Sequence, residues 1–174
     1  MEYTDPYWTS EMGSYANCYA FACSTGAVDS NIHPDILFKL SPNNNPPYRT
    51  TKATFLNGLE QDGLKQISSP SACGKGYYPI AFMAYYTDEG DECPYDFHFF
   101  KLETIDTSEQ RWSSKWSGSP PTIETADFNP SDGYTHGHRT YEFVVFFAVP
   151  EPGLIPKHLE RYNAVNELGE SGRL

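Results

Sequence analysis

Residues 13–25 read GSYANCYAFACST, and this stretch organises the expected fold of the 174-residue chain. Small, turn-prone residues precede Cys18, and an almost wholly apolar run follows it, so the pattern predicts a buried helix that begins at Cys18. The unpaired N–H groups at a helix N-terminus favour anions, which makes Cys18 a candidate nucleophile. A purely structural role stays open, because free cysteine is among the most buried residue types.

Length and composition are those of one domain, expected to span residues 1–174 with a core at about 13–150. Aromatic residues make up 16% of the chain and hydrophobic residues 39%, which favours a packed globule, while 14 prolines and 13 glycines favour many loops. The net charge of −11 disfavours nucleic acid and anionic membrane surfaces as partners, because an acidic surface repels both.

The first residues, MEYTDPYW, contain neither a basic segment nor an apolar stretch, so no signal peptide is expected. No apolar run reaches the length needed to span a bilayer. We therefore expect a soluble protein. The pattern leaves three locations open: the cytoplasm, export by a route that needs no signal peptide, or association with a larger particle.

Four cysteines occur at irregular spacing, without the Cys-x-x-Cys pairs typical of zinc sites. Cys18 and Cys23 are five positions apart on the expected helix and point in different directions, which disfavours a disulfide between them. Cys73 and Cys93 flank an expected strand. A disulfide between these two and a reduced pair are both compatible with the sequence.

The remaining chain predicts an α+β fold. A helix is expected from Thr51 to Gly63, with apolar residues near helical spacing and Thr50 or Thr51 as its cap. Alternating or continuous apolar runs predict strands at 76–87, 94–103, 111–116 and 141–149. The other segments are a lead-in at 1–12, irregular stretches at 29–48 and 118–137, and a C-terminal helical segment at 156–168. We expect an antiparallel sheet with the helices on one side.

The sequence DFHFF at residues 96–100 contains the best candidate for a base that acts with Cys18. Strand alternation places Asp96, His98 and Phe100 on one face, and Phe97 and its neighbours on the other. An imidazole can hold a thiol as thiolate and then protonate a leaving group near neutral pH. His98 as a hydrogen-bonded core histidine is the alternative.

Metal and cofactor sites are not expected. His136 and His138 lie in a glycine-rich loop that lacks a defined third ligand. The acidic turn at residues 88–92 lacks the ligand spacing of an EF-hand loop, so it predicts a solvated turn.

Three segments together resemble the papain-like fold superfamily: NCYAFA at 17–22, DFHFF at 96–100 and RWSSKWSG at 111–118. The likeness covers roughly residues 14–149. It is nearest to the compact bacterial and viral branch that includes NlpC/P60-type enzymes and related thiol peptidase toxins. The resemblance implies Cys18 as nucleophile, His98 as general base and acid, and the Cys18 backbone N–H as an oxyanion donor. It also implies that Asn17 supplies or orients another oxyanion donor.

The third catalytic residue is where the sequence departs from this pattern. Relatives of this kind place a histidine, asparagine or aspartate on the strand after the histidine, where this chain has Ser113, Ser114 and Lys115. Asp127, in the loop that follows, is the residue we expect to take the role. A simple pair of Cys18 and His98, or a fold that has lost activity, remains open.

These features predict a thiol hydrolase that cleaves an amide or peptide bond of a protein or peptide substrate through a Cys18 thioacyl intermediate. The alternative is a catalytically inactive papain-like module that serves as a structural or binding subunit of a larger assembly, such as a virion or a secretion apparatus. An acyl transferase of the same fold is a third reading, because it shares the first half-reaction with the hydrolase.

Overall fold

The computed structural model describes residues 17–23, 51–105, 108–116, 119–151 and 153–154. Three sequence predictions lie outside these residues: the lead-in at 1–12, the irregular stretch at 29–48 and the C-terminal helical segment at 156–168.

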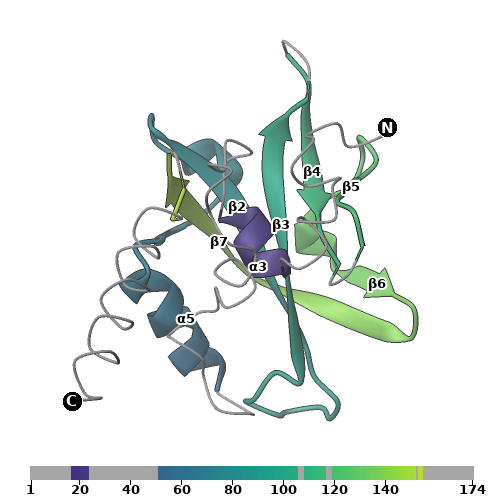
Figure 1. The fold of residues 1–174 in the computed structure, drawn as a ribbon. Helices are drawn as coiled ribbons and strands as arrows, with labels where there is room; N and C mark the ends of the chain where they lie inside the picture. The colour runs from purple at the N-terminus through teal and green to yellow at the C-terminus, as the bar shows by residue number, and fades with distance from the viewer. Residues whose placement is uncertain (1–16, 24–50, 106–107, 117–118, 152, 155–174) are drawn as a thin grey trace, which may run out of the picture.

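An antiparallel sheet is the centre of the structure (Figure 1). Its hydrogen-bonded order is β1-β7-β2-β3-β4-β5, and β6 pairs with β7 outside this path. The strands are β1 (Lys65–Ile67), β2 (Tyr77–Tyr85), β3 (Asp96–Thr104), β4 (Gln110–Ser114), β5 (Thr122–Ile123), β6 (Tyr134–His136) and β7 (Arg139–Pro150). Short 3-10 turns span Pro70–Ala72 and Pro130–Asp132.

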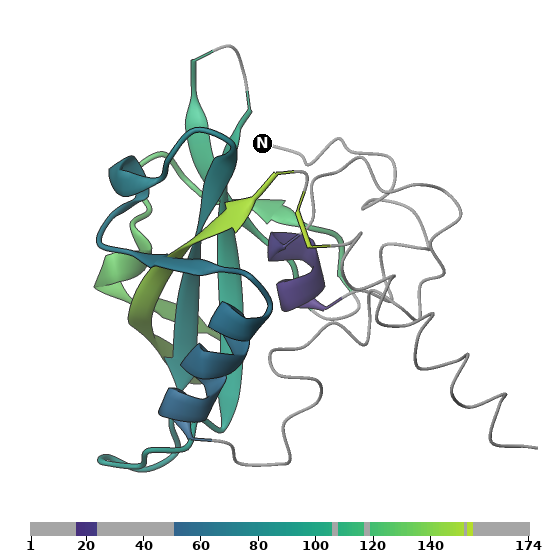
Figure 2. The same ribbon diagram turned by 90° about the vertical axis from the view of Figure 1, so that its left-hand side faces the viewer.

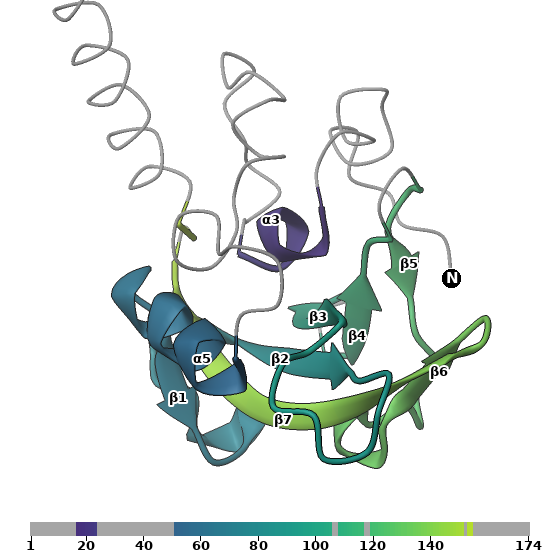
Figure 3. The ribbon, with the colours of Figure 1, turned by 90° about the horizontal axis from the view of Figure 1, so that it is seen from below.

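Two helices, α3 (Cys18–Ala22) and α5 (Lys52–Gln61), lie on the same side of the sheet (Figures 2 and 3). Each begins at a capped N-terminus. The Asn17 side chain accepts from the Ala20 N–H, and the Thr51 hydroxyl accepts from the Thr54 N–H. These caps satisfy N–H groups that have no partner within the helix.

The two faces of the sheet carry separate apolar clusters. The helix-side cluster lies between the sheet and the two helices, and includes Cys18, Phe21, Phe55, Phe82 and Phe99. The opposite cluster contains Met83, Phe100, Trp112, Tyr141 and Phe146, with Trp116, Phe128 and Tyr134 packed against it. The central strands are therefore buried on both sides, and neighbouring residues along them belong to different clusters.

Strand β7 connects the sheet to the hairpin that covers the opposite cluster. Its register against β2 shifts between Phe82, which pairs with Val145, and Met83, which pairs with Phe143. Val144 is thus an extra residue, and such a bulge bends a strand. The first residues of β7 pair with β6 instead of β2. The bend allows one strand to serve both the main sheet and the β6–β7 hairpin.

The expected α+β class, the antiparallel sheet and the helices on one side are confirmed for the described residues. Thr51 caps the second helix as predicted, although the helix ends at Gln61. Strand β1 was not predicted, and the stretch 118–137 is not wholly irregular, since it contains β5 and β6. These strands have two or three residues, which is too short for an alternating pattern to emerge from the sequence.

A buried hydrogen bond joins the two helices. The Tyr19 hydroxyl donates to the carboxylate of Asp62 at 2.8 Å, and Asp62 is the C-cap of α5. We expect Tyr19→Phe to lower the free energy of unfolding by about 1–3 kcal/mol, because a buried carboxylate loses a donor. Urea denaturation followed by circular dichroism measures this change.

Tyr77→Phe is the matched control, since it removes a hydroxyl that accepts from Lys65 in a solvent-exposed hydrogen bond. This control should change stability by less than about 0.5 kcal/mol. Equal effects of the two substitutions would contradict the assigned role of the Tyr19 to Asp62 hydrogen bond.

Candidate functional site

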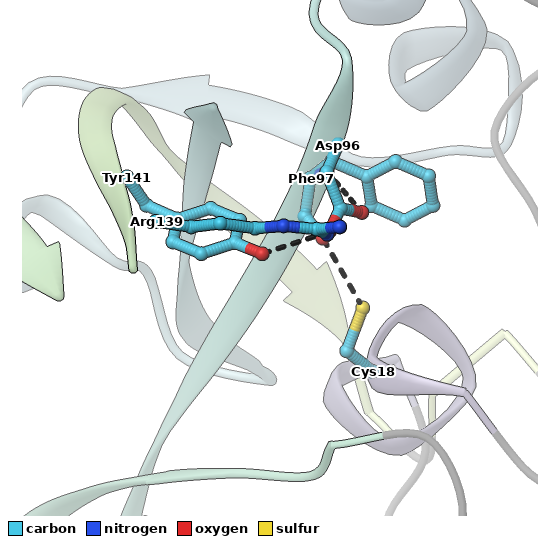
Figure 4. Close-up of polar contacts among 5 residues, drawn as sticks. All are labelled: Cys18, Asp96, Phe97, Arg139 and Tyr141. Atoms are coloured by element: carbon cyan, nitrogen blue, oxygen red, sulfur yellow. Dashed lines mark hydrogen bonds and ion pairs between the residues drawn. The ribbon is translucent and has the colours of Figure 1, made fainter. Parts of the chain in front are cut away.

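Cys18 is the first residue of α3, and its side chain packs against β3. The residue is 8% exposed and belongs to the helix-side cluster. Its sulfur lies 3.9 Å from the Phe97 carbonyl oxygen, toward which the thiol donates (Figure 4). The thiol is therefore held against the backbone of β3, in a mainly apolar setting.

Burial raises the pKa of the Cys18 thiol from 9.0 to about 12, and the negative charge of Asp96 adds to this shift. Burial therefore outweighs the expected effect of the helix N-terminus on the ionisation of Cys18. A helix of five residues provides a weak dipole, and the cost of removing a thiolate from water exceeds its effect. The structure describes a neutral thiol at neutral pH.

His98 lies on β3, one residue beyond Phe97, and points to the other face of the sheet. It pairs with Met83 of β2, which belongs to the opposite cluster. Its ring stacks on Trp116, with centroids 3.7 Å apart and the planes 5° from parallel. The residue is 1% exposed, and burial together with the charge of His136 lowers the pKa of His98 from 6.5 to about 3.

The structure therefore does not bring Cys18 and His98 together. The sheet lies between the sulfur and the imidazole, so the contact that a thiol and general base pair requires is not formed. Strand alternation is the reason. The alternation predicted for residues 96–101 is present, but the helix carrying Cys18 packs on the face of Phe97 and Phe99, which is not the face of His98.

The other two predicted site residues have local roles. Asp127 is exposed and follows β5, and a hydrogen bond from Thr125 is the main cause that lowers the pKa of its carboxyl group. The Asn17 side-chain oxygen caps α3 through the Ala20 N–H at 2.8 Å. In this arrangement Asn17 orients the start of the helix, and the hydrogen bond of Asp127 is made within its own loop.

Asp96 shares the His98 face, as the alternation predicts, but it serves different partners. Its carboxylate accepts from the Tyr141 hydroxyl at 2.8 Å and forms an ion pair with Arg139 (Figure 4). The Arg139 guanidinium also lies over the rings of Tyr85 and Tyr95, 5.6 and 5.5 Å from their centroids. This network fixes the start of β7 against the start of β3.

The sequence reasoning missed the charged neighbour of the thiol, which is Lys115. It is buried, and burial lowers its pKa from 10.5 to about 8, while its electrostatic interaction with Cys18 opposes that shift. The alternation of side chains between the two faces of the sheet, continued beyond β4, could have predicted this position. If Trp112 and Trp116 share one face, Ser113 and Lys115 lie on the other, which is the face of α3.

Several further observations limit the chemistry. Cys73 and Cys93 are free, as are the other two cysteines. Within the described ranges, no three histidine, cysteine or carboxylate side chains gather in a way that could hold a metal ion. No helix in the same ranges has the length and apolar character required to cross a membrane.

Comparison of the chain with protein-family models, curated proteins and solved structures finds no match. The class that the described residues define is an α+β fold with a mostly antiparallel sheet and few helices.

Thiol alkylation tests the burial of Cys18. At neutral pH we expect iodoacetamide to modify Cys73 and Cys93, which are partly exposed, well before Cys18 and Cys23, which are buried. Peptide mass spectrometry at timed intervals gives the four rates. Labelling of Cys18 at or above the rate of a model thiol would contradict the raised pKa. The control is protein unfolded in urea, in which all four cysteines should react at similar rates.

Proposed function

We propose that this chain is a papain-like module that acts without thiol catalysis, as a structural or binding subunit of a larger assembly. The observation that carries the proposal is the separation of Cys18 from His98 by the sheet. Each side chain also has the wrong ionisation for catalysis, since the thiol has a pKa of about 12 and the imidazole a pKa of about 3. A nucleophile and base that work near neutral pH need values close to it.

The papain-like part of the proposal rests on the order of elements. A helix that begins at a capped cysteine packs on an antiparallel sheet, and its neighbour β3 carries the histidine. This order of elements supports the papain-like part of the proposal, although Cys18 and His98 lie on different faces of the sheet. In the proposed module, the cysteine helix is retained as a packing element, and Phe21 together with Cys18 fills the space above β3.

A surface at the start of β3 suits contact with a protein partner. Tyr95 is 57% exposed and is the large apolar side chain that the described part of the chain leaves in solvent. It packs beside Arg139, whose guanidinium is held in place by the Asp96 carboxylate. Tyrosine and arginine are the residue types enriched at interface hot spots, and a side chain already fixed loses little entropy on binding.

A second candidate is the thiol hydrolase, and the interaction between Cys18 and Lys115 is the observation that favours it. A buried amine with a pKa of about 8 is a suitable general base, and it lies on the face of the thiol. In this reading Lys115 takes the role that the resemblance assigns to His98. The hydrolase needs water and substrate to reach a sulfur that is 8% exposed, so the described arrangement supports it less well.

Cys18→Ala distinguishes the two functions. The binding module predicts a folded variant whose associations and biological effect match the wild type, with a loss of stability of about 1 kcal/mol from the small cavity. Circular dichroism measures folding and size-exclusion chromatography measures association. The biological effect is compared with that of the wild type.

Tyr95→Ala is the companion variant, because its side chain is exposed and its loss should leave folding unchanged. We expect it to weaken association while Cys18→Ala does not. A folded Cys18→Ala protein without biological effect, beside an active Tyr95→Ala protein, would reject the binding module in favour of the hydrolase.

A further inference from the structure

The Trp116 indole lies between two imidazole rings. On its inner side His98 stacks at 3.7 Å, and on its outer side His136 of β6 stacks at 3.8 Å with the planes 13° from parallel. The Tyr134 ring is also stacked on Trp116, with centroids 6.0 Å apart. This sandwich is one of the contacts by which the β6–β7 hairpin is held against the edge formed by β3 and β4.

The inner ring of the sandwich is a buried polar group without a hydrogen-bond partner. The Nε2 atom of His98 has no partner within the described structure. Its surroundings are aromatic, with Phe100 at 5.1 Å, Tyr141 at 6.1 Å and Tyr134 at 6.5 Å between ring centroids. A neutral imidazole tolerates this setting at some cost, whereas an imidazolium there would be a buried charge without an acceptor.

The charged and titratable groups around His98 cannot offset such a charge. His136 faces it across Trp116, and a positive charge there opposes a second one on His98. Tyr134 of β6 interacts with Glu124, and Tyr141 of β7 donates to Asp96. The Asp96 carboxylate is itself occupied by Arg139. From β2 the facing residue is Met83, which carries no charge.

We propose that the sandwich of His98, Trp116 and His136 is a proton-sensitive latch, which releases the β6–β7 hairpin when His98 takes up a proton. Release exposes the Trp116 and Tyr134 rings and gives the imidazolium access to water. Gly133 before β6 and Gly137 in the hairpin turn have φ angles of 84° and 60°. These left-handed conformations favour glycine.

The direction of the pH effect follows from linkage. The pKa of His98 is lowered on folding, from 6.5 to about 3, so the closed latch is fully stable above 6.5 and loses stability as the pH falls from 6.5 toward 3. Each pH unit below 6.5 favours the open state by about tenfold, provided that opening restores the ordinary pKa. At about pH 4.5 the opening equilibrium should have risen about 100-fold.

Hydrogen exchange measured by mass spectrometry between about pH 7.5 and about pH 4.5 tests the latch. After correction for intrinsic rates, we expect the amides of residues 134–141 in the wild type to lose about 100-fold in protection. The amides of β2 and of the β7 segment paired with it should keep theirs. His98→Phe retains a ring that can stack on Trp116 but cannot be protonated, so it should abolish the loss.

His138→Gln is the matched control, because His138 is an exposed histidine in the turn of the same hairpin and takes no part in the sandwich. It should behave as the wild type does. An equal loss of protection in His98→Phe, or a loss spread evenly over β2 and β7, would overturn the latch.

If His98→Phe does not fold, carbon-13 labelling of the wild-type histidines decides by NMR. The His98 ring signals should titrate together with the loss of hairpin protection. Titration of His98 while the hairpin stays protected would overturn the proposal.

Discussion

Strand β3 is buried on both faces, and this constraint determines what the candidate site can do. Successive side chains of a strand point to opposite sides, so Phe97 and Phe99 join the cluster beneath α3 while His98 and Phe100 join the other. A shift of one residue in register would move all of them across the sheet. Because both faces are packed, such a shift would put His98 among the phenylalanines of the helix side and is strongly disfavoured.

Burial then shifts the pKa values of Cys18 and His98 away from the values that catalysis requires. For Cys18 the shift from 9.0 to about 12 corresponds to about 4 kcal/mol against the thiolate. His98 is held neutral by the same desolvation on its own face. Lys115 interacts with Cys18, but the pKa of the thiol is still raised, and the carboxylate on the His98 face, Asp96, is engaged by Arg139 and Tyr141. The two residues therefore behave as core residues of two different clusters.

Local patterns were sufficient to predict most of the fold. The apolar run at 141–149, the alternation at 96–101 and the threonine cap at Thr51 all correspond to elements of the structure. Each of these features depends on residues that are close together in the sequence, so the sequence pattern predicts it.

The failure at the site has a non-local origin. The sequence DFHFF is aromatic on both sides of the strand, so nothing in it indicates which face receives the cysteine helix. The burial of the Cys18 sulfur depends on Phe97, 79 positions away. The shielding of His98 depends on the β6–β7 hairpin, which precedes the bulge at Val144. The sequence shows that Lys115 follows β4, but its proximity to the Cys18 thiol depends on tertiary packing.

The most direct test of the account is the set of nuclear Overhauser contacts of the His98 ring protons in the folded protein at neutral pH. We predict contacts with the ring protons of Trp116 and Tyr134, and none with the β protons of Cys18. Strong contacts between the His98 ring and Cys18, with no contact to Trp116, would contradict the separation of the two residues by the sheet.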